Sequence, residues 1–360
     1  MQTFIFDGTI NSDQPLATCS KDLKDSHEAK HGKNTPIPVP SMPTSSGTRL
    51  YFPATGIRAS LRRACRDVIR NHVIASTGNP TPFSLDVHYL LTLGGVKGSD
   101  ETDKKTVADE ARWRDLNPLL SLFGAGAAGF LGFVEGHLHV GNAITEEPCE
   151  PTTFSGARTD DLYRDKSQLR YFSDEDILEL IGRSIGNKSR SKLDADLKTA
   201  KKALSAAKIK GGDAAIDAAS KKVEDLTAQI ASVKEASGAG DVSVGMPLAG
   251  YQAIPQGERM QHIMRLVRSN ELELGCLLAA LSEFAMNPVV GAHKATGCGQ
   301  VSGQWEVFEV TESGKNSLGT AVLRPYEPIQ LTGTLGEKLA LFRAFLESGK
   351  GDFGIPRLEA

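Results

Sequence analysis

The order of the expected strands and helices predicts an α+β fold for this chain, with an open antiparallel sheet and helices on one face of the sheet. Strand-like apolar runs lie near both ends of the chain, at 2–10 and 301–310. Two helical segments with one apolar face lie between these runs, at 53–74 and 270–286. Near the middle, apolar residues recur every three or four positions over 190–235, which indicates an inserted pair of helices.

Length and composition limit the class of protein. The 360 residues suffice for one large or two ordinary domains, and the net charge of −3 argues against a uniformly basic nucleic-acid binder while allowing a local basic surface. The five cysteines are odd in number and include no Cys-x-x-Cys pair, which disfavours a disulfide framework or a cysteine zinc site. No apolar run is long enough to cross a bilayer. We therefore expect a cytoplasmic protein without a cofactor, a bound metal or a membrane contact.

The first part of the core is expected to span residues 1–142. Within it, residues 11–48 are polar and rich in Pro, Ser, Lys and Asp, and they include too few apolar residues to pack alone. We therefore predict that this stretch is a flexible loop insertion. The other elements expected here are a strand at 84–93, a helix at 107–122 that is broken at Pro118, and a strand at 130–140.

A helical insertion is expected over residues 143–246, where it interrupts the core. A short helix at 173–185 has Ser173 as its cap. An antiparallel hairpin of two helices follows at 190–235. The residues that form its apolar seam are Leu193, Leu197, Ala200, Leu204 and Ala207 in the first helix, and Ile216, Ala219, Val223, Leu226, Ile230 and Val233 in the second.

The helix at 53–74 carries arginines at steps of four residues, which form a basic row that drifts slowly around its surface. Thr55 is placed to cap the free N–H groups at the start of this helix. Guanidinium groups beside a helix N-terminus suit phosphate oxygens, but the same row would also keep a core helix soluble as an ordinary solvated face. Both interpretations fit the row taken alone. The row consists of Arg58, Arg62, Arg66 and Arg70, with Arg49 before it and Arg63 beside it.

The second part of the core is expected to span residues 247–360 and contains a glycine-rich loop at 291–299. Glycines permit a close approach of the backbone to a phosphodiester, and Lys294 and Thr296 add donor groups for it. A tight turn between a helix and a strand would need the same glycines. The loop alone does not decide between these two roles.

Two short motifs stand in the wrong context for the chemistry that they suggest. His27 to His31 spells His-Glu-x-x-His, but its polar flanks provide no apolar helix face to hold two zinc ligands. Gly124 to Gly129 spells Gly-x-Gly-x-x-Gly, but a helical stretch precedes it and a strand follows, which is the reverse of a dinucleotide site. Neither a metalloprotease nor a Rossmann site is expected.

Four stretches resemble, in the same order, segments of the RAMP superfamily of CRISPR effector proteins. They are 52–62 with its basic helix start, 115–124 ending in Leu-Phe-Gly, 250–257 with its Ile-Pro pair, and the glycine-rich loop at 291–301. These stretches span most of the chain outside the two insertions. The length and the divergent first loop are most like the backbone subunit of a type IV complex.

This resemblance implies an RRM-like (ferredoxin-like) antiparallel sheet core with long loop insertions and a helical-hairpin insertion. It also implies copies of the chain that stack in a helical filament along a CRISPR guide RNA (crRNA), with a protruding thumb that kinks the guide. Target DNA, other CRISPR effector subunits and a separate helicase are the further partners that it implies. The residues expected to contact RNA are Arg49, Arg58, Arg62, Arg63, Arg66, His293, Lys294, Thr296 and Gly297.

The chain departs from the family pattern in two places. The family's glycine loop carries an arginine where this chain has Ala295 and Thr296, which leaves Lys294 as the expected cation. Type III relatives cut target RNA with an aspartate of the first loop, and Asp22 lies at a similar position but without the family's glycine and histidine pattern. We therefore expect no catalytic residue. Two alternatives are a metal-dependent endoribonuclease that uses Asp22 or Asp25, and a stand-alone RNA-binding module.

Overall fold

The chain divides into two compact units in the computed structural model. The first unit comprises Met1–Ser155 and Ala249–Ala360, and the second comprises Gly156–Leu248. The structure describes residues 2–32, 35–94, 107–125, 134–157, 165–210, 213–236 and 247–353. No helix within these ranges is both long and apolar enough to span a membrane.

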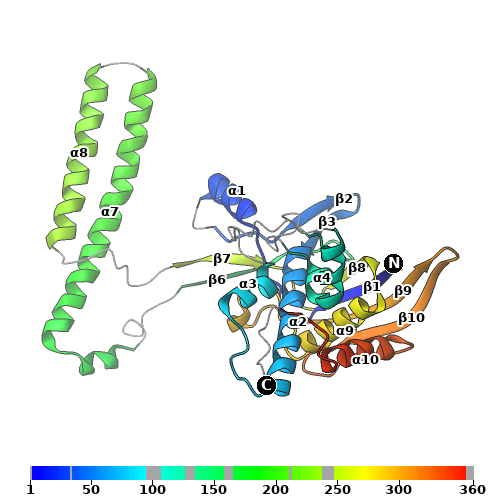
Figure 1. Ribbon diagram of the computed structural model, residues 1–360. Coiled ribbons are helices and arrows are strands. Elements are labelled where there is room, and N and C mark those ends of the chain that lie inside the picture. Colours follow the sequence, from blue (N-terminus) through cyan, green and yellow to red (C-terminus); the bar gives the residue numbers. More distant parts are fainter. Residues whose placement is uncertain are drawn as a thin grey trace. The chain divides into compact units, whose positions relative to one another are not determined.

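The first unit is built on a large antiparallel sheet (Figure 1). Its strand order is β11-β10-β9-β1-β8-β5-β3-β2, and β4 pairs with β8 as well. The strands are β1 (Gln2–Ser12), β2 (Ser41–Thr44), β3 (Gly47–Phe52), β4 (Leu138–Val140), β5 (Ala143–Thr145), β8 (Arg259–Ser269), β9 (Val301–Thr311), β10 (Gly314–Leu323) and β11 (Gln330–Leu331).

The helices of the first unit include two long ones that pack against each other, α2 and α9. Their bounds, with those of the other helices, are α1 (Lys21–His31), α2 (Ala54–Thr77), α3 (Leu85–Leu93), α4 (Val107–Leu116), α5 (Pro118–Phe123), α9 (Glu271–Ala285), α10 (Leu335–Glu347) and the 3-10 turn η2 (Lys294–Thr296).

The core elements follow the order of a ferredoxin-like fold. β1 is followed by α2, then by the short strands β4 and β5, then by β8, α9 and β9. In the sheet, β9, β1, β8 and β5 are neighbours in that order, and β1 is antiparallel to both β8 and β9. The α+β class and the RRM-like antiparallel core predicted from the sequence are therefore confirmed.

One face of the sheet is packed against helices because apolar side chains alternate along its strands. In β8, Met260 and Met264 are fully buried, whereas Gln261 and Arg265 are exposed. The helices α2, α9 and α10 pack side by side and share a core with the buried strand residues (Figure 1). The structure confirms the predicted strands near both ends of the chain, β1 and β9, and the two predicted helices, α2 and α9.

The predicted strand at 84–93 is wrong, since this stretch forms the helix α3. Ser84 caps the first turn by accepting a hydrogen bond from the Val87 N–H at 3.2 Å, and Gly94 ends the helix with a φ of 90°. Val87 and Leu91, four residues apart, are its buried side chains. A short apolar run fits a strand and a helix equally well, and here the two caps favour the helix.

The predicted helix break at Pro118 is confirmed, since α4 ends at Leu116 and α5 begins at Pro118. Asn117 lies between them and accepts a hydrogen bond from the Leu120 N–H at 3.1 Å, which caps α5. The strand predicted at 130–140 is confined to β4 within the described residues, and 126–133 lie outside them.

The stretch at 11–48 is not the unpacked loop that its composition predicts. It contains the end of β1, the helix α1 and the strand β2, and Leu16 and Val39 are buried. The backbones of Leu16 and Ile254 exchange two hydrogen bonds of 3.0 Å. A few apolar residues suffice because such backbone bridges anchor the segment on the core.

The second unit is a hairpin of two long antiparallel helices, α7 and α8, which the ribbon of β6 and β7 joins to the first unit (Figure 1). The insertion begins later than the expected position 143, because β5 lies in the large sheet and the first unit extends to Ser155. The bounds are β6 (Thr152–Ala157), the 3-10 turn η1 (Lys166–Tyr171), α7 (Asp174–Lys210), α8 (Asp213–Ala236) and β7 (Pro247–Ala253).

The predicted hairpin is confirmed by burial along its two helices. Every predicted seam residue is buried or half-buried, and the residues between them over 192–208 and 215–233 are exposed. The short helix predicted at 173–185 is the start of α7 rather than a separate element. Ser173 does cap it, since its hydroxyl accepts a hydrogen bond from the Asp176 N–H at 3.2 Å.

Candidate nucleic-acid interface

The start of α2 is fixed by a side chain from a distant part of the sequence rather than by a cap from its own first turn. The predicted cap by Thr55 is not formed, because Pro53 is the N-cap residue and Thr55 is exposed. The Ala54 N–H instead donates to Asn142 Oδ1 at 2.8 Å. The buried apolar residues of α2 are Ile57, Leu61, Ala64, Cys65 and Ile69.

Arg62 is buried against the carboxyl ends of two helices. Its Nε donates to the Leu91 carbonyl at 2.7 Å, and its terminal nitrogens donate to the Leu90 and Phe123 carbonyls at 3.0 and 3.1 Å. The residue is 7% exposed, and burial, followed by the charge of Arg58, lowers the pKa of Arg62 to about 10. Arg62 therefore donates to carbonyls at the ends of α3 and α5, where the regular helical hydrogen bonding stops. This placement removes Arg62 from the predicted phosphate contacts.

Arg58 and Arg66 are also held by the protein. Arg58 donates to the Phe123 carbonyl at 2.8 Å and lies 5.8 Å from the centre of the Phe123 ring. Burial lowers the pKa of Arg58. Arg66 forms an ion pair with Asp67 at 2.7 Å. Each guanidinium keeps N–H groups that these contacts do not use, so phosphate contact by Arg58 and Arg66 stays a prediction.

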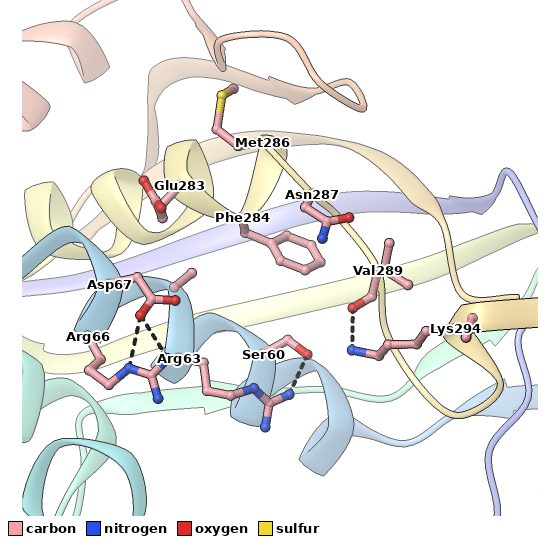
Figure 2. A pocket seen from close by; sticks show the side chains of 12 residues that line it. Ser60, Arg63, Arg66, Asp67, Glu283, Phe284, Met286, Asn287, Val289 and Lys294 are labelled. Atoms are coloured by element: carbon pink, nitrogen blue, oxygen red, sulfur yellow. Dashed lines mark hydrogen bonds and ion pairs between the residues drawn. The ribbon is translucent and has the colours of Figure 1, made fainter. Parts of the chain in front are cut away.

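Arg63 and Lys294 line one pocket between α2, the end of α9 and the glycine-rich loop (Figure 2). The pocket encloses about 570 Å³. Arg63 donates to Ser60 Oγ at 3.1 Å, and Lys294 donates to the Val289 carbonyl at 3.0 Å. In the described part of the chain, neither Arg63 nor Lys294 has an ion-pair partner. The two cations are thus brought together with their charges uncompensated.

Among the described residues, the acidic groups of this pocket form no ion pair with Arg63 or Lys294. Asp67 is paired with Arg66, as Figure 2 shows. Burial, and then the charge of Asp67, raise the pKa of Glu283. Burial, and then the charge of Arg63, lower the pKa of Lys294. An anion bound near Arg63 and Lys294 would relieve the repulsion between them, so the pocket favours anionic ligands.

The glycine-rich loop is a tight turn that also presents polar groups. Gly291 has a φ of 79°, and a Cβ there would lie 2.4 Å from the Ala17 carbonyl oxygen, so only glycine fits. Both the N–H and the hydroxyl of Thr296 donate to the His293 carbonyl at 3.0 Å. The exposed residues at its tip include His293, Lys294, Thr296 and Gly297.

A stack of aromatic rings beside this loop is not evident from the sequence. The Tyr251 ring lies 3.7 Å from the His293 ring and 5.2 Å from the Phe154 ring, measured between ring centres. The three residues come from β7, the loop and β6, and no spacing rule relates segments so far apart. Two backbone pairings bring the three rings together. One is the pairing of β6 with β7, and the other is the bridge between Ala292 of the loop and Ala17.

Arg49 lies on β3, away from the pocket shared by Arg63 and Lys294. It pairs with Met42 across the β2–β3 hairpin, and its Nε is buried without a hydrogen-bond partner. Contact between Arg49 and RNA stays a prediction that this pocket does not support.

The aspartates of residues 11–48 that are candidate catalytic residues do not form one cluster. Asp22 and Asp25 are exposed on α1. Asp13 accepts a hydrogen bond from the Ser302 hydroxyl at 2.9 Å, and burial raises its pKa. Within the described residues, no group of three or more potential metal ligands occurs.

The two short motifs of the sequence add no site. The rings of His27 and His31 contact each other at a tilt of 39° on α1, a helix in which no residue is buried. Residues 126–129 of the Gly-x-Gly-x-x-Gly motif lie outside the described residues.

Comparison with known proteins gives matches only among solved structures, since no protein-family model and no curated protein matches the chain. A chain of a "Type IV-B CRISPR Complex" is 13% identical, with a TM-score of 0.39, and the match covers 88% of this chain and 94% of that one. Csc2 of Thermofilum pendens is 11% identical, with a TM-score of 0.32 and coverage of 99% and 78%. Csm3 of Methanopyrus kandleri is 11% identical, with a TM-score of 0.35 and coverage of 88% and 78%.

Proposed function

We propose that this chain is a non-catalytic backbone subunit of a CRISPR effector complex that binds guide RNA. Copies of the chain assemble along the guide and present it for pairing with target DNA, together with other effector subunits and a helicase. The observation that carries the proposal is the pocket in which Arg63 of α2 and Lys294 of the glycine-rich loop lie together, with no ion-pair partner among the described residues.

A phosphodiester backbone matches this pocket better than a neutral ligand does. Two cations in one pocket repel each other, and a phosphate between them is attracted to both. The loop adds the exposed Gly297, where the backbone is open to a close approach, because no described atom lies within 4 Å of the point that a Cβ would occupy. Contacts of this kind do not read base sequence, which is what a subunit that repeats along any guide needs.

The pocket also joins two of the stretches that resemble the RAMP superfamily. The stretch at 52–62 forms the start of the helix that carries Arg63, and the stretch at 291–301 supplies Lys294. The two stretches are more than two hundred positions apart in the sequence and meet in the fold. This convergence supports a shared role for them.

The proposal is tested by co-expression of the full-length protein with a candidate guide RNA. We expect RNA to co-purify, which raises the absorbance ratio at 260 and 280 nm above that of bare protein. The double variant Arg63→Gln, Lys294→Gln is expected to lose most of this RNA. Arg343→Gln with Lys350→Gln, two exposed residues that lie outside both this pocket and the helical insertion, is the control with the same change of charge. A wild-type protein with the absorbance of bare protein contradicts the proposal.

Assembly is tested by sedimentation of the protein with guides of increasing length. We expect the sedimentation coefficient to rise in steps as longer guides accept more copies. A single monomer peak at every length would instead support a stand-alone RNA-binding module.

The non-catalytic role is tested separately. The guide-loaded protein is incubated with complementary RNA and Mg²⁺, and the RNA is expected to stay intact. Cleavage that disappears in Asp22→Ala or Asp25→Ala would establish the endoribonuclease alternative. Both aspartates are exposed on α1, so these variants are expected to fold normally.

A further inference from the structure

Three aromatic rings from distant parts of the chain form one stack next to the glycine-rich loop. The Tyr251 ring lies between the other two, 3.7 Å from His293 and 5.2 Å from Phe154. The planes of these two pairs differ by only 8° and 17°. Near-parallel, closely spaced rings allow a further flat ring to add at the end of the stack.

The end of the stack at His293 is held in place by the loop backbone. His293 has a φ of 58°, which is uncommon for a residue with a side chain. Its carbonyl accepts hydrogen bonds from the Thr296 N–H at 3.0 Å and the Cys298 N–H at 3.3 Å. Strained backbone conformations of this kind persist where the surrounding structure holds them, and they cluster at binding sites. The ring is therefore positioned before a ligand arrives.

The stack is held by the protein at Tyr251 and is exposed to solvent at His293. The backbone of Tyr251 bridges to Ile37, and its hydroxyl lies 3.5 Å from Cys298 Sγ. Phe154 and Tyr251 are half-buried, whereas His293 is exposed. Among the described residues, Tyr251 supplies the one aromatic ring contact of His293, and His293 is exposed, so no second ring covers its other face there. A stack that served only the core would not end in an exposed ring.

The residue next to His293 in the chain links this ring to the pocket that contains the two cations. Lys294 follows His293 directly and lines the pocket with Arg63. Because the two residues are adjacent in the chain, a single strand whose phosphate contacts Lys294 has a nucleotide within reach of the His293 ring.

We propose that the exposed face of the His293 ring binds a nucleobase of the bound single strand, with Tyr251 and Phe154 stacked behind it. This inference rests on the proposed function and changes the role of His293 from a phosphate contact to a base contact. Because every nucleobase has a flat aromatic face, the site accepts any base and leaves the guide sequence unread.

The test uses the full-length protein and single-stranded RNA that carries 2-aminopurine at one position at a time. The emission of this base falls when it stacks on a ring, so wild type is expected to quench it at a defined position. His293→Asn removes the stack end and tolerates a positive φ. His293→Phe restores a ring, and Lys294→Gln weakens phosphate contact only.

We expect His293→Asn to abolish the quenching and to weaken binding roughly tenfold, with the salt dependence of binding unchanged. His293→Phe should recover both. Lys294→Gln should lower the salt dependence while its complex still quenches. Quenching and affinity that are unchanged in His293→Asn overturn this inference and leave the proposed function standing. If wild type binds no RNA at low salt, the proposed function and this inference both fail.

Discussion

Arg62 and Arg63 are neighbours in the sequence, but Arg62 is buried against helix ends while Arg63 is exposed in the pocket with Lys294. Successive residues of a helix point about 100° apart, which is enough to separate the two side chains. The basic row of α2 therefore contains two kinds of arginine. One kind stabilises the fold, and the other is available to a ligand.

Replacement of Arg62 is expected to destabilise the fold. Arg62→Gln removes charged donors from three carbonyls at the ends of α3 and α5, and the expected loss is about 2–4 kcal/mol in the free energy of unfolding. Urea unfolding followed by tryptophan fluorescence measures this loss. Arg63→Gln is the control, and the expected change there is within about 0.5 kcal/mol. Equal effects of the two substitutions would refute the division of roles.

Binding of RNA is expected to depend on salt through Arg63 and Lys294. Each removal of a phosphate contact lowers the slope of log K against log salt concentration by roughly 0.7 for a single strand. Arg63→Gln and Lys294→Gln are thus each expected to reduce the slope by that amount. Titrations over a series of salt concentrations measure it. A slope that falls equally in Arg343→Gln, on the exposed surface of α10, would show a diffuse charge effect rather than contact in the pocket.

Helix period and glycine content predict much of this architecture. The apolar positions of α2 and of the hairpin seam follow directly from their spacing, because each of these helices buries one face. The helix α9 is instead buried on all sides from Glu273 to Leu281, as its nearly continuous apolar sequence predicts. The spacing does not predict which arginines of α2 are buried and which are exposed. Arg62 is buried only because α3 ends beside it, and the sequence predicts a strand where α3 lies.

The candidate site is likewise predicted only in part. Lys294 and His293 are evident from the loop, but Tyr251 and Phe154 are not, since they meet His293 only when β6 pairs with β7. The packing of Leu16 depends on a backbone bridge to Ile254, which no composition rule detects. Long-range backbone pairing therefore accounts for the features that local patterns miss.

The buried His262 is expected to make the fold sensitive to acid. Trp305 Nε1 donates to His262 Nδ1 at 3.1 Å, and burial lowers the pKa of His262 from 6.5 to about 4, opposed in part by the backbone of Gly141. Between pH 6.5 and about 4, His262 binds a proton in the unfolded chain but not in the folded chain. Stability is therefore lost as the pH falls from 6.5 to 4, by up to about 3 kcal/mol.

Thermal unfolding over the range from neutral pH down to the lowered pKa of His262 measures this dependence. His262→Gln keeps an acceptor for Trp305 and has no titrating ring, so its stability should fall less over the same range. The difference in unfolding midpoint temperature between wild type and His262→Gln is expected to decrease as the pH falls. A constant difference over the whole range would contradict the role of His262.

The hairpin of α7 and α8 is expected to unfold without the first unit. Leu204 and Leu226 lie in its seam, and Leu204→Asn with Leu226→Asn places polar groups there at a cost of about 1–2 kcal/mol each. The tryptophans of the chain, Trp113 and Trp305, both lie in the first unit, so their fluorescence reports that unit alone. Far-ultraviolet circular dichroism reports the helices of both units. We expect the double variant to lose helical signal at temperatures where the fluorescence is unchanged, whereas Thr227→Asn on the exposed surface changes neither. A parallel shift of the fluorescence midpoint would show that the two units unfold together.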